Sequence, residues 1–195
     1  MASATNTKGG PMASATGLFE KIRGNIFIIP EDRMEKLASG KGYGDSFVYL
    51  VAIVLINAAG SLLVSVLLSL LLGKGVAASL GLLAVSVIVS IPMSYAFAGV
   101  LYALLRLFGG KANCLQTVQV AIYGNTCSSV FGFIPIVGFL ASLVSLSNMV
   151  LGFRRVHKLG LWKVIAAVLI FLALTVAAVV LLALLTGPLM GVPPY

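Results

Sequence analysis

The sequence predicts an all-α fold: a polytopic membrane helical bundle with five transmembrane helices, preceded by a short amphipathic N-terminal helical segment. Three observations lead to this prediction. The 195 residues are 60% hydrophobic and only 9% charged. Two long stretches, 46–73 and 76–105, carry no charged residue, and about 20 apolar residues are enough to cross a bilayer as a helix. The basic residues also gather in alternate segments of the chain.

The first 45 residues differ in kind from the rest, because they hold all five acidic residues and six of the thirteen basic ones. The letters MASAT occur at residues 1–5 and again at 12–16. This repeat is typical of an engineering scar or a duplicated start, and residues 1–16 are expected to form a disordered tail. The tail has no apolar stretch before a small-residue cleavage site, so the sequence does not indicate a signal peptide.

Residues 17–45 are expected to form a cytoplasmic, interfacial segment. Apolar side chains recur there with helical spacing, at Leu18, Phe19, Ile22, Ile26 and Ile29. Glu20, Lys21 and Arg23 face away from this stripe, so the helix suits the headgroup boundary of a membrane. Pro30 is well placed as the first residue of a second short helix that ends near Ser39.

Five apolar segments follow, at about 46–72, 76–105, 114–131, 134–153 and 161–185, and they leave 186–195 as a short extracytoplasmic tail. The doubtful point is whether 114–153 crosses once or twice. As one helix it would be about 58 Å long, whereas the hydrocarbon core is about 30 Å thick. A hairpin is therefore expected, with Gly132 and Pro135 in its turn.

The distribution of Lys and Arg tests this count independently. With five spans, twelve of the thirteen bases fall on the side of the N-terminus and only Lys74 falls on the other. Four spans would divide them eight to five. Short basic loops stay in the cytoplasm. The sequence therefore predicts a cytoplasmic N-terminus, an extracytoplasmic C-terminus and an outer position for the bend at 132–135.

Several kinds of chemistry are disfavoured by the composition. No acidic residue follows Asp45, whereas proton relays, cation-coupled transport and two-carboxylate hydrolysis need carboxylates in the membrane. His157, the single histidine, is expected in a solvated loop at the membrane edge. Cys114 and Cys127 would lie about 20 Å apart on one helix, too far for a disulfide. We therefore expect no enzyme, metal site, cofactor or nucleic-acid partner.

Small polar residues recur at spacings of three and four along the predicted spans, which places each set on one helix face. They form a candidate helix-packing or pore stripe: Asn57, Ser61, Ser65, Ser86, Ser90, Gln119, Tyr123, Asn125, Ser142, Ser145 and Asn148. Such residues let membrane helices approach closely and form hydrogen bonds. Packing is the favoured interpretation. A water-lined path built from the same residues is the alternative.

A cluster of basic residues lies between the last two predicted spans, at Arg154, Arg155, Lys158 and Lys163, and no acidic residue is near it in the sequence. These bases could serve only to orient the protein in the membrane. The sharper hypothesis is a site for anionic lipid headgroups, because each base near an anionic surface contributes about 1 kcal/mol. Lys21 and Arg23 could join that site from the interfacial helix.

Two segments resemble the Yip-domain family of Ypt/Rab-interacting proteins. Their sequences are GGKANCLQTVQVAIYGNTCSSVFGFIPIVGF and SNMVLGFRRVHKLGLWKVIAAVLI. The matching residues are Tyr123, Gly124, Pro135, Gly152, Arg154, His157, Gly160 and Lys163. The resemblance covers roughly 20–185. It implies five spans with a cytosolic N-terminus, in agreement with the distribution of bases.

The resemblance also implies a role, since eukaryotic relatives are similar to trafficking factors that bind prenylated small GTPases. This chain lacks their longer cytosolic region and keeps only Tyr123–Gly124 of the Asp-Leu-Tyr-Gly element. These departures argue against small-GTPase binding and favour a prokaryotic plasma-membrane member. We therefore expect a non-enzymatic membrane protein, acting in membrane organisation or trafficking through lipids, partner proteins or a second copy of itself. A channel or uniporter for a small neutral solute is the alternative.

Overall fold

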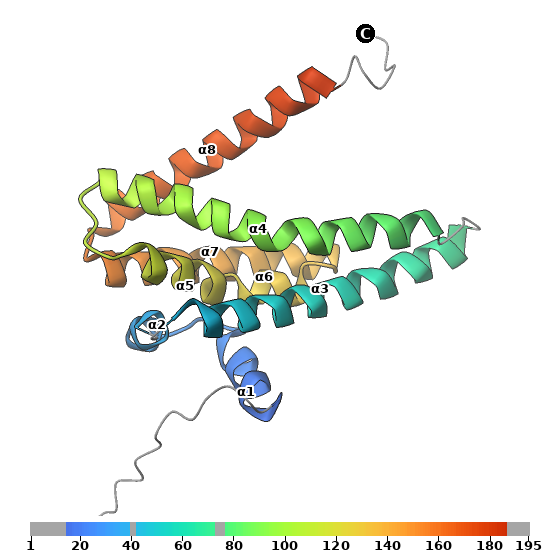
Figure 1. Ribbon diagram of the computed structural model, residues 1–195, viewed down its shortest axis with the longest axis horizontal. Coiled ribbons are helices and arrows are strands. Elements are labelled where there is room, and N and C mark those ends of the chain that lie inside the picture. The colour runs from blue at the N-terminus through green and yellow to red at the C-terminus, as the bar shows by residue number, and fades with distance from the viewer. Residues whose placement is uncertain (1–14, 40–41, 73–76, 187–195) are drawn as a thin grey trace, which may run out of the picture.

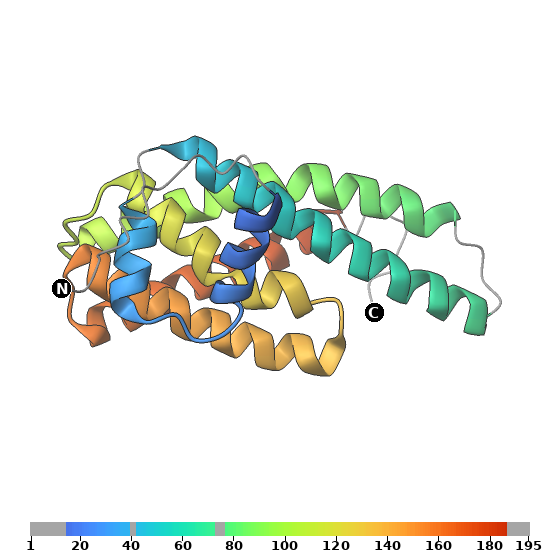
Figure 2. The same ribbon diagram turned by 90° about the horizontal axis from the view of Figure 1, so that it is seen from below.

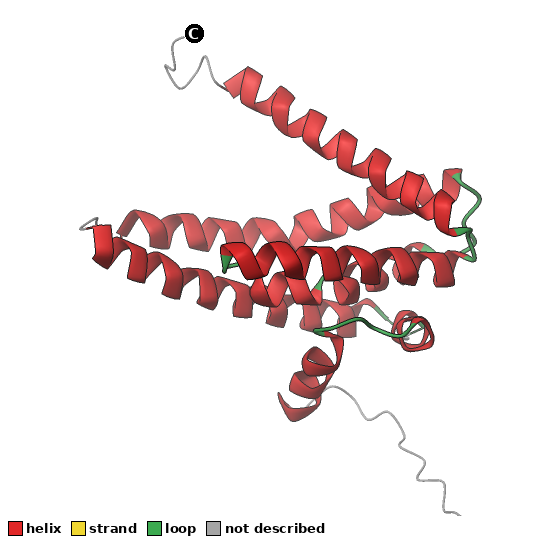
Figure 3. Cartoon of the chain, turned by 180° about the vertical axis from the view of Figure 1, so that it is seen from behind, coloured by secondary structure: helices red, strands yellow, loops and turns green. Residues whose placement is uncertain are grey.

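The computed structural model describes residues 15–39, 42–72 and 77–186, and every regular element in these ranges is a helix (Figure 3). The elements are α1 (Ala15–Asn25), α2 (Glu31–Ala38), α3 (Tyr43–Leu72), α4 (Ala77–Leu107), α5 (Cys114–Gly124), α6 (Thr126–Phe131), α7 (Pro135–His157) and α8 (Leu161–Thr186). Most of each predicted tail, 1–16 and 186–195, lies outside the described residues.

Four of the described helices are long and apolar enough to cross a membrane: Tyr43–Leu71, Ala84–Leu107, Pro135–His157 and Leu161–Leu184. They correspond to four of the five predicted spans. The remaining segment, 114–131, is divided into α5 and α6, of 11 and 6 residues. Each is too short to cross a bilayer alone. The all-α membrane fold is confirmed, and a fifth span formed by α5 and α6 together stays a prediction.

The helices from α3 onward run alternately in opposite directions, except that α6 continues in the direction of α5 (Figures 1 and 2). The hairpin of α3 and α4 extends beyond the turn between α6 and α7, and α8 leaves the bundle at an angle (Figure 1). The loop after α4 and the end of α7 meet at one end of the bundle, where the Lys111 N–H donates to the His157 carbonyl at 3.2 Å.

The interruption between α5 and α6 lies at Gly124 and Asn125. A Cβ atom on Gly124 would lie 2.8 Å from Met149 Cγ and 3.2 Å from the Met149 backbone nitrogen. The absence of a side chain therefore lets α7 approach α5 closely. One residue later, Asn125 leaves the helical conformation with φ −82° and ψ 2°. The Thr126 hydroxyl then donates to the Tyr123 carbonyl at 2.7 Å.

The N-terminal segment packs against the bundle instead of extending away from it. α1 and α2 lie along one side of the half of the bundle where α5 begins (Figure 1). Ile29 and Met34 of this segment are almost fully buried, and they share one core with Tyr49, Tyr123 and Phe153. The expected second helix is present, although it begins at Glu31 with Pro30 as its N-cap.

The apolar face predicted for residues 18–29 is divided in the structure. Ile22 and Ile29 face the bundle and are buried. Phe19 remains 67% exposed, and Phe27 and Ile28, in the linker between α1 and α2, remain 76% and 66% exposed. The expected position of this segment at the membrane surface stays a prediction.

Candidate functional site

A cavity of about 550 Å³ lies between α3, α4, the α5–α6 junction and α8. Five of the predicted polar residues line it: Asn57, Ser61, Ser86, Ser90 and Asn125. The structure therefore brings together polar stripes from three separate segments. Ser65 is not among the residues that line the cavity, although it follows Ser61 by one helical turn.

The lining of this cavity changes from apolar to polar along the bundle axis. Toward the end of the bundle that carries α2, the walls are apolar, with Leu50, Ile53, Leu101, Ile122 and Phe171. Toward the α6–α7 turn apolar residues such as Ala58, Val87 and Phe133 are joined by polar ones: Asn57, Ser61, Ser90, Asn125, Ser128 and Ser129. The order follows from the antiparallel helices, since Leu50 precedes Asn57 along α3 whereas Leu101 follows Ser90 along α4. The cavity is thus amphipathic.

Hydrogen bonds hold several of these polar side chains. Asn57 Nδ2 donates to the Ser129 carbonyl at 2.7 Å and so ties α3 to α6. Ser90 donates to the Val87 carbonyl at 3.0 Å, and Ser94 donates to the Ser90 carbonyl at 2.7 Å. Both serines therefore use their hydroxyl proton within α4, while a hydroxyl oxygen keeps lone pairs that can accept a further hydrogen bond.

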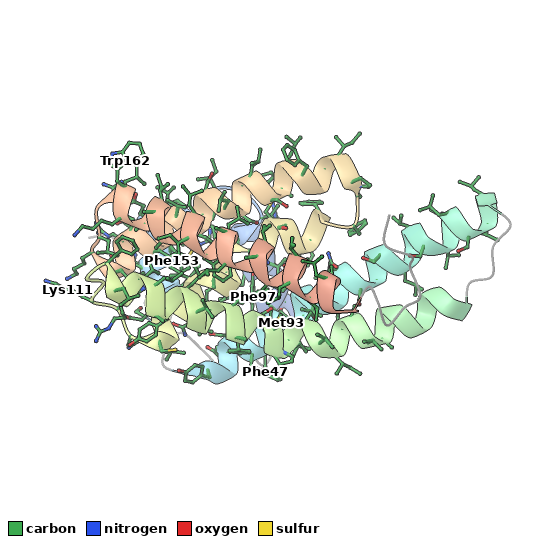
Figure 4. All side chains as sticks on the ribbon, turned by 90° about the horizontal axis from the view of Figure 1, so that it is seen from above. Phe47, Met93, Phe97, Lys111, Phe153 and Trp162 are labelled. Carbon is green, nitrogen blue, oxygen red and sulfur yellow. The ribbon has the colours of Figure 1, made fainter. Side chains whose placement is uncertain are left out.

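Two aromatic contacts border the cavity. At the polar end, the Phe133 ring rests on Gly60 of α3, where any Cβ atom would overlap the ring. At the apolar end, Phe97 of α4 and Phe171 of α8 pack edge to face with ring centroids 5.6 Å apart; Figure 4 labels Phe97. Gly60, Phe133 and Phe171 were not predicted as site residues, because their pairing joins segments far apart in the sequence.

Three further polar candidates do not line the cavity themselves and make contacts between helices. Ser145 is buried, and its Oγ accepts a hydrogen bond from the Ser128 N–H at 2.8 Å. Ser142 donates to the Gly138 carbonyl at 2.8 Å and lies 3.2 Å from the Ser128 hydroxyl. Buried Gln119 donates to the Gly42 carbonyl at 3.4 Å. These residues join α7 to α6 and α5 to the start of α3.

Asn148 fixes the N-terminal segment to α7. Its Oδ1 accepts from the Ile29 N–H at 2.9 Å, and its Nδ2 donates to the Phe27 carbonyl at 2.9 Å. One buried side-chain amide thus pairs with a backbone N–H and a backbone carbonyl of the linker between α1 and α2. The side chains of Phe27 and Ile28 remain exposed in this arrangement.

Tyr123 lies in a second contact with this segment. Lys21 Nζ donates to the Tyr123 hydroxyl at 3.0 Å and lies 4.6 Å from the centre of the Tyr123 ring. Tyr49 packs edge to face on Tyr123, at 4.7 Å between centroids. Burial lowers the pKa of Lys21 below its ordinary value, and the Asp45 carboxylate partly offsets this effect. Lys21 therefore belongs to this contact and not to a solvated face.

The arginines of the candidate headgroup site have acidic partners, contrary to the expectation from the sequence. Arg155 contacts Glu35 at 2.8 Å and Asp32 at 3.2 Å, and Arg154 lies 3.6 Å from Glu31. All three acids belong to α2, which packs beside α7 although about 120 residues separate them in the chain. Exposed pairs of this kind contribute little to stability.

Lys158 and Lys163 differ from the arginines, because no ion pair is found for either lysine among the described residues. Both are exposed, as is Lys111 from the loop before α5. Lys111 and Trp162 lie at the same end of the bundle (Figure 4). Trp162 is 80% exposed. Exposed bases beside an exposed tryptophan are typical of a membrane interface.

The expectation of a solvated loop for His157 was wrong. Its side chain is 0% exposed, and its Nε2 lies 2.9 Å from the Thr117 hydroxyl. Thr117 also lies 3.1 Å from the Asn113 carbonyl. Because a carbonyl can only accept, Thr117 donates to Asn113 and accepts from the N–H of His157. The histidine thus joins α7 to the start of α5.

Potential metal ligands do not cluster within the described residues. No group of three or more His, Cys, Asp or Glu side chains in that part of the chain could hold a metal ion. Cys114 and Cys127 are both free thiols, as expected.

The fold defines a polytopic α-helical membrane protein with an amphipathic cavity and a docked N-terminal segment. A family model described as the Yip1 domain matches residues 24–184, and the chain belongs to this family. The resemblance drawn from the sequence is therefore confirmed. Comparisons with curated proteins and with solved structures found no match.

Proposed function

We propose that this protein is a non-enzymatic membrane protein that organises membranes, or supports trafficking, through contacts with lipids and partner proteins. The observation that carries the proposal is the N-terminal segment. Asn148 holds its backbone against the bundle, while Phe19, Phe27 and Ile28 stay largely exposed. Large apolar side chains exposed on a charged segment favour insertion at the membrane surface.

The proposed topology has five spans, a cytoplasmic N-terminus and an extracytoplasmic C-terminus. The antiparallel order of α3, α4, the α5–α6 pair, α7 and α8 supports it (Figure 2), as does the distribution of bases. A thiol reagent applied from outside should label a cysteine placed at Ile134 but not one placed at Lys111. Labelling at Lys111 from outside would contradict this topology. A prokaryotic plasma-membrane location also stays a prediction.

The headgroup site is proposed to consist mainly of Lys158 and Lys163, with Lys111 beside them. Arg154 and Arg155 stay candidate contacts through the part of each guanidinium that α2 leaves exposed. A guanidinium can contact two oxygens at once, so an arginine can bind a carboxylate and a phosphate together. Small-GTPase binding is not part of this proposal. A protein partner or a second copy of the chain would bind to the part of the surface outside the proposed headgroup site.

Surface insertion can be tested with tryptophan fluorescence, because the chain has a single tryptophan. In a Trp162→Phe background, Phe27→Trp should be quenched by lipids brominated near the headgroup. Ser39→Trp, at the exposed end of α2, is the matched control and should be quenched much less. Equal quenching at both positions would contradict insertion of the linker.

The polar half of the cavity supports a second candidate function, a channel or uniporter for a small neutral solute. It is lined by the Asn57–Ser61 and Ser86–Ser90 stripes, which could contact such a solute. Purified protein in liposomes should then raise the flux of a neutral solute such as glycerol or urea. Flux no higher than in protein-free liposomes would remove this candidate and leave the membrane-organising function in place.

A further inference from the structure

We propose that the cavity between α3, α4, α6 and α8 binds a neutral amphiphile. The polar head, carrying hydroxyl or amide groups, lies at the α6–α7 end, and the apolar chain points toward the end of the bundle that carries α2. This proposal goes beyond membrane organisation and does not depend on insertion of the N-terminal segment.

Charge selects the class of ligand. None of the described residues that line the cavity is ionisable. A phosphate or carboxylate placed there would lack a charged partner in a poorly polarisable environment, which is costly. The polar end instead offers two side-chain amides and several hydroxyls, from Asn57, Asn125 and the serines beside them. Amides and hydroxyls match a neutral head that both donates and accepts hydrogen bonds.

The change of polarity along the cavity selects an amphiphile over a wholly polar solute. The half between Leu50, Leu101 and Phe171 offers only apolar contacts to a solute, whereas the half at Asn57 and Ser129 offers hydrogen bonds. A continuous path for a polar solute would need polar groups along its whole length. The apolar half would oppose such passage and would stabilise an alkyl chain by about 0.8 kcal/mol per buried methylene.

The size and borders of the cavity suit a bound molecule. Its volume of about 550 Å³ lies within the range of about 300–1,000 Å³ that is typical of ligand pockets. Phe133 rests on Gly60 at the polar end, and Phe97 packs on Phe171 at the other. In the proposed topology the polar end faces outward, which is the orientation of a lipid in the outer leaflet.

The proposal can be tested by photolabelling the full chain in nanodiscs with two monoacylglycerols. One carries a diazirine next to the glycerol and the other carries it at the end of the acyl chain. The first should label residues near Ser128 and Phe133, and the second should label residues near Met149 and Phe171. Excess unlabelled monoacylglycerol should reduce both signals about tenfold, whereas a fatty acid or an alkane of equal length should not. Labelling confined to lipid-facing positions such as Leu143 would overturn the proposal.

A pair of variants controls for general effects of substitution. Ser90→Leu fills part of the cavity, and Ser147→Leu changes a serine of α7 that makes the same kind of hydrogen bond within its own helix. Labelling should fall about tenfold in Ser90→Leu, equivalent to about 1.4 kcal/mol, and should persist in Ser147→Leu. Equal labelling of the two variants would overturn the proposal. If Ser90→Leu fails to fold, the proposal is tested by the competition experiment on the wild-type protein, which compares unlabelled monoacylglycerol with a fatty acid.

Discussion

Two regions of this protein are built from the same kind of sequence pattern and differ in what the pattern does. Along α3 and α4, the stripe of Asn and Ser residues borders an amphipathic cavity. Along α7, the stripe of Ser142, Ser145 and Asn148 is used in direct hydrogen bonds to α6 and to the N-terminal segment. Spacing alone therefore predicts that a helix face is polar, and not whether the face is packed or open.

The difference arises from what lies opposite each stripe. α7 carries Gly138, where a Cβ atom would lie 2.9 Å from the Gly132 carbonyl oxygen, so the α6–α7 turn approaches it closely. By contrast, the α3 and α4 stripes border the cavity, and Gly99 of α4, which does not line it, has nothing within 4 Å of such an atom. Close backbone approach brings hydrogen-bonding groups together along α7, whereas the cavity occupies part of the space opposite the α3 and α4 stripes.

The largest effect is expected at Asn148. Asn148→Leu leaves the Ile29 N–H and the Phe27 carbonyl without their partner, which should lower the free energy of unfolding by about 3 kcal/mol. Asn57→Leu is the matched control, because Asn57 donates a hydrogen bond of 2.7 Å to the Ser129 carbonyl at the edge of the cavity, and its loss should cost about 1 kcal/mol. Thermal unfolding in detergent would measure both. Equal losses of unfolding free energy in the two variants would contradict the difference between the packed α7 stripe and the α3 stripe.

A smaller effect is expected at the contact between α6 and α7. Ser145→Leu inserts bulk at a buried position and removes the acceptor of the Ser128 N–H, so it should cost about 1–3 kcal/mol. Ser142 is exposed, and Ser142→Leu should cost less. A larger loss for Ser142→Leu than for Ser145→Leu, in the same unfolding assay, would show that the packed face is assigned wrongly.

The glycines offer a comparison at the level of one methyl group. Gly138→Ala must displace the α6–α7 turn and should cost about 1–2 kcal/mol. Gly99→Ala enters open space and should be neutral or slightly stabilising, because glycine weakens a helix interior by about 0.5–1 kcal/mol relative to alanine. The melting temperatures of the two variants should therefore move in different directions. Similar shifts would argue against close approach at Gly138.

The smallest effect is expected at the basic end of the bundle. Anionic lipid should raise the melting temperature of the wild-type protein, since each base near an anionic surface contributes about 1 kcal/mol. Changing Lys158 and Lys163 to Gln should remove most of this increase. Changing Arg154 and Arg155 to Gln should remove less of it, because α2 already supplies carboxylates to both arginines. The opposite ranking would make the arginines the principal headgroup contacts.

Local patterns in the sequence predicted much of the fold. Four long apolar segments became four helices able to cross a membrane, and Pro30, Gly132 and Pro135 marked real ends of helices. These patterns can be recognised from residues that are adjacent in the chain and from the thickness of the bilayer. The interruption at Asn125 was not predicted. It adjoins Gly124, where α7 approaches closely through Met149, a contact between segments that the sequence alone does not pair.

The chemistry of the candidate site was harder to predict, because it depends on partners that are distant in the chain. From the sequence alone His157 resembles a loop residue, but in the fold it contacts Thr117, which is 40 residues away in the chain. Arg155 has no nearby acid in the sequence, yet Glu35 lies 2.8 Å from it in the fold. The polar stripes were predicted as helix faces from their spacing, but their division between the cavity and the packed contacts required the arrangement of all the helices.

The central claim is that the α3–α4 stripe borders an open cavity and the α7 stripe is packed. It can be tested most directly by thiol accessibility in a background with Cys114→Ala and Cys127→Ala. Ser61→Cys should react with a small thiol reagent in the folded protein, because it borders the cavity and thiolate formation needs water. Ser145→Cys should react only after denaturation. Equal rates at the two positions in the folded protein would contradict the account.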